Sequence, residues 1–297
     1  MLDRITTTFV EVDDFCKQFF VQWEEYLLFQ GKRKEAPGPA CGLSESEIMT
    51  IIILHHSARF KYFKNFYEGI VLGLLRKHFP GAPCYDRFIA IVHKVMVPMS
   101  FFMISKTRQS KRTGIYYIDS TQLPVCHNLR SKRHKVFKGL AAKGKTSTGW
   151  FFGLKLHLVF NDEFEIVAVM LTRGNVSDTT PVPQLTKNLI GKLFGDKGYI
   201  GKKLTEILLS RGLQLMTRVR KNMKSLPMSF TDKMLLNTRN MAETVIGHIK
   251  AFSSLNLPKH RSAINAFVNI CAAIIAYLFN PIQKQHLQKI SYQLLIS

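Results

Sequence analysis

The spacing of apolar positions changes at about residue 110. Before this point apolar residues recur with helical spacing, and the runs predict helices at 9–28, 44–54, 66–75 and 85–97. Ser44 and Glu47 have the spacing of a capping box at the start of the second run. The first part of the chain is therefore predicted to be a domain of four or five helices.

After residue 113 short apolar or alternating runs replace the helical spacing. They predict strands at 115–118, 150–161, 165–172, 193–194 and 213–219. Helical spacing returns at 201–210, 233–252 and 264–279. This order indicates a mixed α/β fold. We therefore expect a helical N-terminal domain at 1–104, a polar basic linker at 105–113 and an α/β domain at 114–297.

Charge distinguishes the two parts more sharply than composition does. The chain has 42 Lys and Arg against 20 Asp and Glu, a formal net charge of +22 and a pI near 9.9. Residues 1–100 carry 12 basic and 11 acidic side chains, whereas residues 101–297 carry 30 and 9. Nucleic acid is the commonest polyanion that such a basic protein meets. We expect the α/β part to contact it, whereas the near-neutral helical part is either a DNA-binding module or a purely structural domain.

Other partners and compartments are less favoured by the sequence. The longest apolar run, 266–279, is shorter than the roughly 20 residues that cross a bilayer, so no membrane partner is expected. The N-terminus lacks an apolar segment followed by a small-residue cleavage site. Five widely spaced cysteines form no CxxC pair, which argues against a disulfide framework or a zinc ribbon. A cytoplasmic location is expected.

Two acids follow predicted buried strands directly. Asp119 comes after the strand at 115–118, and Asp196 comes after the strand at 193–194 and Gly195. Only nine carboxylates occur after residue 100, so acids in these positions are informative. Open α/β sheets place their sites at the carboxyl ends of their strands. Two adjacent strand ends would bring Asp119 and Asp196 together.

A third acid lies on a predicted helix. Arg239, Glu243 and Lys250 are spaced by four and seven residues, which places them within an arc of roughly 40° on one helix face. An acid between two bases on one stripe would suit a phosphate and a metal ion together. The alternative is a solvated salt-bridge face with i,i+4 pairing.

Three converging carboxylates in a basic surround suit metal-assisted phosphoryl chemistry. Mg²⁺, with Mn²⁺ as a possible substitute, takes oxygen ligands and keeps several waters, so Asp119, Asp196 and Glu243 would suffice with the substrate's own phosphate oxygens. Two ions about 3.5–4 Å apart stabilise the attacking and leaving oxygens of an in-line displacement. Uncompensated acids so close together would repel one another, which favours bound cations.

A basic insert at 126–149 follows the first acid. Residues 120–161 contain no acid, and Trp150 and two Phe residues follow the insert. Phosphate contact is favoured over a merely solvated loop because this run adjoins Asp119 and ends in aromatics. The expected DNA-binding residues are Arg130, Lys132, Arg133, Lys135, Lys138, Lys143 and Lys145, together with Arg239 and Lys250. Lys155 belongs to the same acid-free run.

The motifs resemble those of a known family. IDST at 118–121, GDKGY at 195–199 and the spacing Arg239-x3-Glu243-x6-Lys250 are similar to the three signature regions of DDE transposases of bacterial insertion sequences, the insertion-sequence-four-like superfamily. The segments 130–159, 171–178 and 192–200 resemble the nine-eighty-two group of that superfamily. The likeness spans nearly the whole chain, and several motifs agree in order and spacing.

The resemblance implies a ribonuclease H-like catalytic domain behind a helical N-terminal domain. It makes Asp119, Asp196 and Glu243 the first, second and third acids of a metal-binding catalytic triad. It also implies that water hydrolyses the transposon end and frees a 3′ hydroxyl, which then attacks target DNA. The family's third signature has a Tyr three residues before its Arg, whereas this chain has Leu236. Double-stranded DNA at transposon ends and targets is the expected partner.

Two alternative functions remain open. The protein would be a metal-dependent nuclease if it only hydrolysed DNA, or an inactive transposase-derived DNA-binding protein if it only bound DNA. A homodimer on DNA and a bacterial, nucleoid-associated location follow from the resemblance. Asp178 is either a metal-facing acid or, as the position before a predicted turn favours, a helix N-cap.

Overall fold

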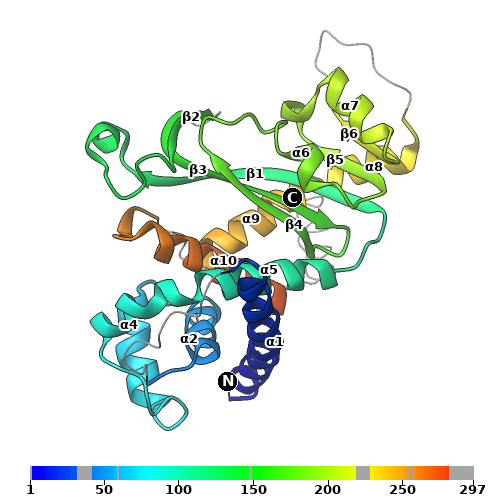
Figure 1. Cartoon of the computed structure of the whole chain (residues 1–297). Coiled ribbons are helices and arrows are strands. Elements are labelled where there is room, and N and C mark those ends of the chain that lie inside the picture. The colour runs from blue at the N-terminus through cyan, green and yellow to red at the C-terminus, as the bar shows by residue number, and fades with distance from the viewer. Residues whose placement is uncertain are drawn as a thin grey trace, which may run out of the picture. The chain divides into compact units, whose positions relative to one another are not determined.

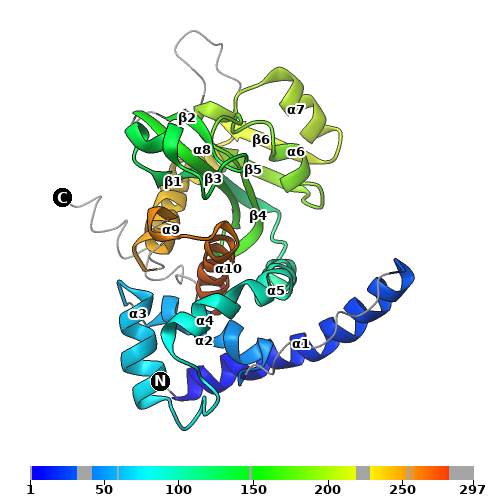
Figure 2. The same ribbon diagram turned by 60° about the vertical axis from the view of Figure 1, so that its left-hand side comes forward.

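The structure is a computed structural model (Figures 1 and 2). It describes residues 2–31, 42–58, 60–146, 149–218, 228–252, 255 and 257–280. The chain forms two compact units. Unit 1 comprises residues 1–105, 251–255 and 261–279, and unit 2 comprises residues 106–250, 256–260 and 280–297.

The described residues of unit 1 form helices joined by turns and short irregular segments. Its elements are α1 (Leu2–Phe29), α2 (Glu45–Ser57), α3 (Phe63–Phe66), the π-helix η1 (Tyr67–Leu74), α4 (Tyr85–Ile91), the 3-10 helix η2 (Val92–Val95), α5 (Met96–Gln109) and α10 (Ala263–Phe279). The boundary between the units falls within α5. The core is built around α2, whose ten residues from Ser46 to His56 other than Glu47 are all buried.

The start of α2 follows from its sequence. The Ser44 hydroxyl accepts a hydrogen bond from the Glu47 N–H at 3.2 Å, and the Glu47 carboxylate accepts one from the Ser44 N–H at 2.7 Å. This confirms the predicted capping box, which satisfies two N–H groups that a helix start otherwise leaves without partners.

α10, the last helix among the described residues, belongs to unit 1, whereas the predicted division places it in the α/β domain. Val268, Cys271, Ala272 and Ile275 of α10 pack in the same core cluster as the N-terminal helices. The predicted α/β domain at 114–297 therefore does not coincide with unit 2. The reason is that α10 is apolar and its buried side belongs to the helical core. The expected linker at 105–113 is also shorter in the structure, since α5 continues to Gln109.

A continuous helical stretch from Tyr85 to Gln109 is long and apolar enough to cross a bilayer by length and composition alone. The sequence pattern did not single it out. Phe88, Val95, Met99 and Phe102 of this stretch are buried in the unit 1 core. Core helices of soluble proteins meet the same criterion, so the stretch is weak evidence for a membrane span.

Unit 2 is built on a six-stranded mixed sheet. The strands are β1 (Ile115–Cys126), β2 (Ala142–Thr146), β3 (Gly149–Asn161), β4 (Ile166–Arg173), β5 (Gly191–Gly195) and β6 (Leu213–Thr217). β1 pairs parallel with β5, which pairs parallel with β6, whereas β3 pairs antiparallel with β1, β2 and β4. This mixed sheet confirms the predicted mixed α/β fold class, and it is consistent with the expected ribonuclease H-like fold.

Helices cover both faces of the sheet. Tyr116 and Ile118 of β1 pack with α6 (Val182–Leu185) and α7 (Lys202–Leu209). Tyr117, between them, points to the other face and packs with Leu236 of α8 (Phe230–Thr238). Alternation along β1 therefore directs Asp119 to the α8 face and Ser120 to the α6 and α7 face. The remaining elements are η3 (Asn128–Arg133), η4 (Lys197–Tyr199), α9 (Asn240–Phe252) and η5 (Leu257–Lys259).

β1 is longer than the sequence predicts. It continues eight residues past Ile118, because residues up to Cys126 pair with β3. Asp119 consequently lies within β1 rather than after it. It does lie just beyond Tyr117, the last residue of β1 that pairs with β5.

Candidate active site

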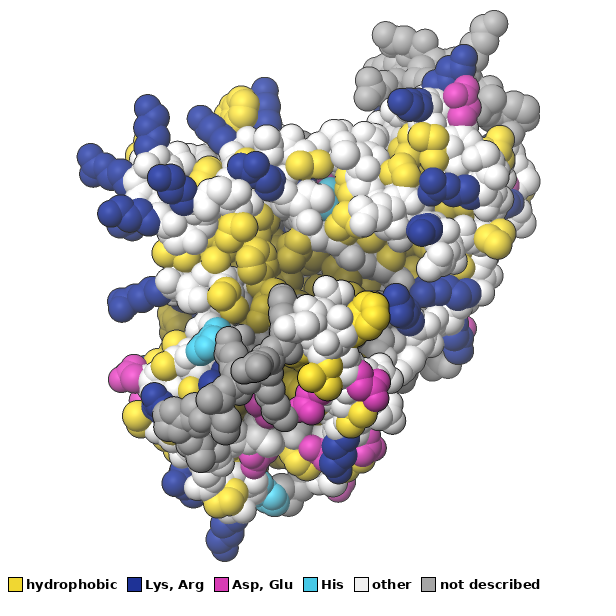
Figure 3. All heavy atoms as spheres, in the orientation of Figure 1, with side chains coloured by type: hydrophobic (Ala, Val, Ile, Leu, Met, Phe, Trp, Pro, Cys, Tyr) yellow, Lys and Arg dark blue, Asp and Glu magenta, His cyan; other side chains and the backbone are white. Residues whose placement is uncertain are grey.

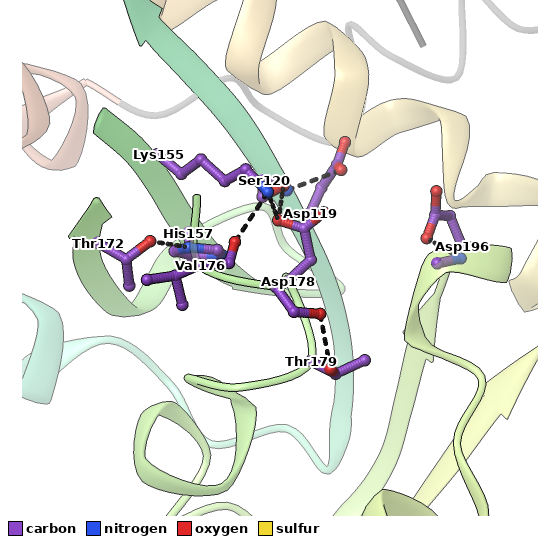
Figure 4. A network of polar contacts seen from close by, with 11 residues as sticks. Asp119, Ser120, Lys155, His157, Thr172, Val176, Asp178, Thr179 and Asp196 are labelled. Carbon is purple, nitrogen blue, oxygen red and sulfur yellow. Dashed lines mark hydrogen bonds and ion pairs between the residues drawn. The ribbon is translucent and has the colours of Figure 1, made fainter. Parts of the chain in front are cut away.

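Asp119 and Asp196 lie where two neighbouring parallel strands stop pairing. The β1–β5 pairing ends at Tyr117 and Phe194. Asp119 lies two positions after Tyr117, and Asp196 lies two positions after Phe194. Figure 4 shows both carboxylates at this end of the strands. The strand ends thus bring together the two acids that the sequence indicated.

The glycines of the GDKGY motif shape the backbone around Asp196. A Cβ at Gly195 would lie 3.0 Å from the Tyr199 ring and 3.2 Å from Ile118, so this position favours a residue without a side chain. The Asp196 carboxylate accepts a hydrogen bond from the Gly198 N–H at 2.7 Å and caps η4. The motif therefore fixes the Asp196 side chain on its own short helix.

Glu243 and Lys250 lie on α9, whereas Arg239 lies at the junction between α8 and α9. α8 ends at Thr238 and α9 begins at Asn240, so the predicted helix at 233–252 is interrupted at Arg239. Arg239 keeps helical backbone angles, and its guanidinium lies 3.6 Å from the Glu243 carboxylate. The Arg239 side chain is 17% exposed, whereas that of Glu243 is 65% exposed. Glu243 is thus paired with Arg239 and also exposed to solvent.

Electrostatics link these residues to Asp119. The pKa of the Asp119 carboxyl is raised from 3.8 to about 6, mainly by burial, and the negative charges of Asp196 and Glu243 contribute in the same direction. The Ser120 N–H and the Arg239 charge act in the opposite direction on the same pKa. Burial lowers the pKa of Lys250, and the charge of Asp119 opposes that shift. Residues of β1 and α9, the residue after β5 and the residue at the junction of α8 and α9 therefore share one electrostatic environment.

The donor chemistry fits a hard divalent cation, although the side chains are not gathered as ligands. Among the described residues, no three His, Cys, Asp or Glu side chains are arranged to hold a metal ion. The partly buried Asp119 carboxyl has its pKa raised and lies near two further acids, whose negative charges oppose its ionisation. Carboxylate oxygens are the ligands that Mg²⁺ prefers, and Glu243, here paired with Arg239, would have to turn toward the two aspartates to join such a site.

A polar network lies behind Asp119, on the α6 and α7 face of the sheet (Figure 4). The Asp178 carboxylate accepts a hydrogen bond from the Ser120 hydroxyl at 2.9 Å and pairs with Lys155 at 3.1 Å. Pro181, and not Asp178, is the N-cap of α6, so the favoured interpretation of Asp178 as a helix cap is wrong. Its carboxylate instead binds two side chains of the sheet.

Lys155 differs from the other basic residues of the acid-free run. It is 7% exposed, and its ammonium also donates to the Val176 carbonyl at 3.0 Å. Phosphate contact is therefore wrong for Lys155, because its charge is already paired inside the protein. Its position between Leu154 and Leu156 in an apolar strand was a signal of burial that the charge run concealed.

The seven predicted DNA-binding residues of the basic insert are all exposed. They are Arg130, Lys132, Arg133, Lys135, Lys138, Lys143 and Lys145. Within the part of the chain that the structure describes, none of them forms an ion pair with an acid. Dark blue Lys and Arg side chains gather at the upper left of Figure 3, over the β2 end of unit 2.

The β2–β3 hairpin combines these charges with aromatic rings. Lys145 pairs in register with Trp150, and Lys143 pairs with Phe152, so the four side chains share one face. The two ammonium groups lie 5.2 and 5.7 Å from the Trp150 ring centroid, and Trp150 is 56% exposed. This face offers cations and a stacking surface together.

Leu236 occupies the position at which the resembling family has a Tyr. It is buried against Tyr117, Phe194 and Met216. A tyrosine hydroxyl is nevertheless present nearby, since Tyr117 bonds to the Thr238 hydroxyl at 2.8 Å. Leu236 contributes packing of α8 on the sheet.

Comparison with known proteins identifies the family. The sequence profile described as "Transposase DDE domain" matches residues 109–263, which is more than half of the chain. This chain belongs to the DDE transposase domain family. The matched range contains Asp119, Asp196 and Glu243.

Two further comparisons are weaker than the match to the DDE transposase domain. A solved piggyBac transposase in a synaptic complex with hairpin DNA is similar over 88% of this chain and 78% of its own, with 13% identity and a TM-score of 0.45. No curated protein sequence matches significantly. The family assignment as a transposase therefore rests on the DDE profile.

Proposed function

We propose that this transposase cuts DNA strands at the ends of an insertion sequence and joins them to target DNA, using a divalent metal ion. The observation that carries the proposal is the position of Asp119 and Asp196 beyond two paired parallel strands, with the charges of Arg239 and Glu243 acting on Asp119. Membership of the DDE transposase domain family supports the same chemistry.

The three acids have distinct roles in this proposal. Asp119 and Asp196 are held by the sheet, and Glu243 completes the ligand set from α9. A divalent cation, Mg²⁺ or Mn²⁺, would neutralise phosphate charge and favour deprotonation of the attacking water. Because the acids need no covalent bond to DNA, the protein contributes mainly position and charge.

Arg239 and Lys250 are suited to hold the phosphate that is cut. Arg239 is mostly buried beside Glu243, and Lys250 is half-buried close enough to Asp119 to respond to its charge. A fixed guanidinium offers several N–H donors to phosphate oxygens. Both side chains thus bring positive charge next to the acids, where charge develops during phosphoryl transfer.

The basic insert supplies the wider DNA contact. Its seven exposed cations would neutralise phosphates, and Trp150 would stack against an exposed base or sugar. We infer double-stranded DNA as the partner, at transposon ends and at the target, with the protein acting as a homodimer on DNA.

We also propose that the protein belongs to the nine-eighty-two group of transposases. We further propose that it is located in the bacterial cytoplasm, associated with the nucleoid. Both proposals rest on the motifs alone.

Strand cleavage tests the proposal directly. A labelled duplex carrying the DNA that flanks this gene is incubated with Mg²⁺ and with wild type or Glu243→Ala. Cleavage at the element's end by wild type alone, followed by joining to a target duplex, is expected. Cleavage without joining would favour the nuclease alternative, whereas equal binding without cleavage by either protein would favour an inactive DNA-binding protein.

A further inference from the structure

Three side chains outside the acid triad connect the interior of the sheet to the first acid. Lys155 lies on β3, Asp178 on the loop after β4, and Ser120 next to Asp119 on β1 (Figure 4). We propose that Lys155 and Asp178 act as positioning residues, which fix the Asp119 carboxylate through Ser120. The inference rests on the proposed function, because it assigns these residues to the same site.

The chain of contacts begins at a buried charge. Lys155 is 7% exposed, and its ammonium binds the Asp178 carboxylate at 3.1 Å and the Val176 carbonyl at 3.0 Å. A buried ammonium is unfavourable unless it is paired and hydrogen-bonded. These two contacts therefore hold the 176–178 segment against β3.

Asp178 also contacts β1. The same oxygen that binds Lys155, Oδ1, accepts the hydrogen bond from the Ser120 hydroxyl at 2.9 Å. Lys155 and Ser120 project from neighbouring antiparallel strands, since Ser120 pairs with His157 and Gln122 pairs with Lys155. One carboxylate oxygen thus joins two strands and a loop on the α6 and α7 face.

Ser120 has hydrogen-bond partners on both faces of the sheet. Its N–H donates to Asp119 Oδ1 at 2.8 Å, whereas its hydroxyl binds Asp178. The side chain is held on one side, and the amide acts on an acid whose side chain points to the opposite side. Fixing the Ser120 side chain therefore fixes the donor that orients the Asp119 carboxylate.

The pair of Lys155 and Asp178 differs from an ordinary structural ion pair because its hydrogen bonds lead, through Ser120, to Asp119. The exposed pair of Lys111 and Glu163, at 2.8 Å, leads to no acid of the triad. Residues that hydrogen-bond behind metal ligands orient those ligands, and their loss typically lowers metal affinity 10- to 100-fold. Lys155 and Asp178 are placed to have that effect on Asp119.

Mn²⁺ binding by the full-length, DNA-free protein tests the inference. Ser120→Ala removes the link to Asp178 but keeps the Ser120 N–H, and Ser120→Thr retains a hydroxyl at the same position. Asp178→Ala removes the link and also leaves Lys155 without its anionic partner. Ser110→Ala is the matched control, because it loses a buried hydroxyl bond, to the Ile166 carbonyl at 3.0 Å, elsewhere in unit 2.

The expected result is a Kd for Mn²⁺ raised about 10-fold in Ser120→Ala, with recovery in Ser120→Thr and no change in Ser110→Ala. Cleavage assays on the same proteins should show a lower kcat and an unchanged KM for DNA. Thermal unfolding identifies any variant that has not folded. If Asp178→Ala does not fold, the comparison of Ser120→Ala with Ser120→Thr decides alone.

Two results would overturn the inference in distinguishable ways. Wild-type Mn²⁺ affinity and kcat in folded Ser120→Ala would refute the positioning role and leave the proposed function intact. A wild-type protein that neither binds Mn²⁺ nor cleaves DNA would refute the metal-dependent function and the positioning role together.

Discussion

The Arg239 guanidinium lies 3.6 Å from the Glu243 carboxylate, across the junction between α8 and α9. The same two charges act in opposite directions on the pKa of Asp119. In the proposed function, Arg239 would become available to a DNA phosphate if Glu243 turned from it to a cation. The pair would then link DNA contact and metal binding at one position.

Replacing any one of the three acids should separate DNA binding from cleavage. Asp119→Ala, Asp196→Ala and Glu243→Ala should each lower strand cleavage at least ~100-fold and leave DNA binding largely intact, because charge stabilisation near the reacting phosphate is lost. Cleavage of labelled duplex and gel-shift assays measure the two effects. A variant that still cuts at the wild-type rate would remove its acid from the site.

The raised pKa of Asp119 predicts how stability depends on pH without metal. The carboxyl has a pKa of about 6 in the folded protein and 3.8 ordinarily, so the folded state binds more protons between these values. The contribution of Asp119 to stability is therefore present below about pH 4 and is lost as the pH rises through about 6. At pH 7.5 Asp119→Asn should be more stable than wild type by up to ~3 kcal/mol.

Urea unfolding in chelator from pH 4.5 to 7.5 measures this difference. The advantage of Asp119→Asn should shrink toward pH 4.5, and Mg²⁺ should reduce it at pH 7.5 by stabilising wild type alone. Parallel stability curves of the two proteins across this range would contradict a raised pKa at Asp119.

The basic insert should account for part of the salt dependence of DNA binding. Arg133→Ala with Lys135→Ala should weaken binding to all sequences and reduce the slope of log K against log salt by roughly two units, if each residue contacts one phosphate. Fluorescence anisotropy at several salt concentrations gives the slope.

A double variant of unit 1 is the matched control for that experiment. Lys77→Ala with Lys94→Ala removes the same charge from two exposed positions in the near-neutral N-terminal part. Its slope should stay close to that of wild type. Equal slopes for all three proteins would assign Arg133 and Lys135 to solvent.

Gly195→Ala should destabilise unit 2 and disturb Asp196. The added Cβ would lie 3.0 Å from the buried Tyr199 ring and 3.2 Å from Ile118, so the ring must move. Overpacking of this kind costs about 1–3 kcal/mol. Urea unfolding measures the cost, and Gly247→Ala is the control because nothing lies within 4 Å of its Cβ position. Equal destabilisation by both changes would show that the contact with Tyr199 has no special role.

Local signals allowed much of the fold to be predicted. The Ser44–Glu47 capping box and the strand at 150–161 were predicted from neighbours in sequence, and both are present in the structure. The expected alternation of exposure is not, because residues from Gly153 to Asn161 are all buried in the middle of the sheet. The length of β1 could not be predicted from 115–118, because residues beyond Asp119 are extended only through pairing with β3. The place of α10 was equally inaccessible, since an apolar helix does not show by its pattern which core it joins.

The candidate site was predictable where strand ends set it. Asp119 and Asp196 follow apolar strands, so their meeting could be expected from topology. The role of Asp178 could not, because its two partners come from β1 and β3 and only the folded register brings them together. Lys155 was obscured by the run of exposed cations around it.

The place of α10 in the helical core has a consequence for synthesis of the protein. The sheet strands and the three acids are all translated before residue 263, whereas the core of unit 1 is completed only when α10 has left the ribosome. The N-terminal helices therefore complete their core only after α10 is made, although they are made first. A message that stops before α10 yields a chain that has every acid of the site and no complete helical core, so such a fragment would be open to proteolysis before it could act on DNA.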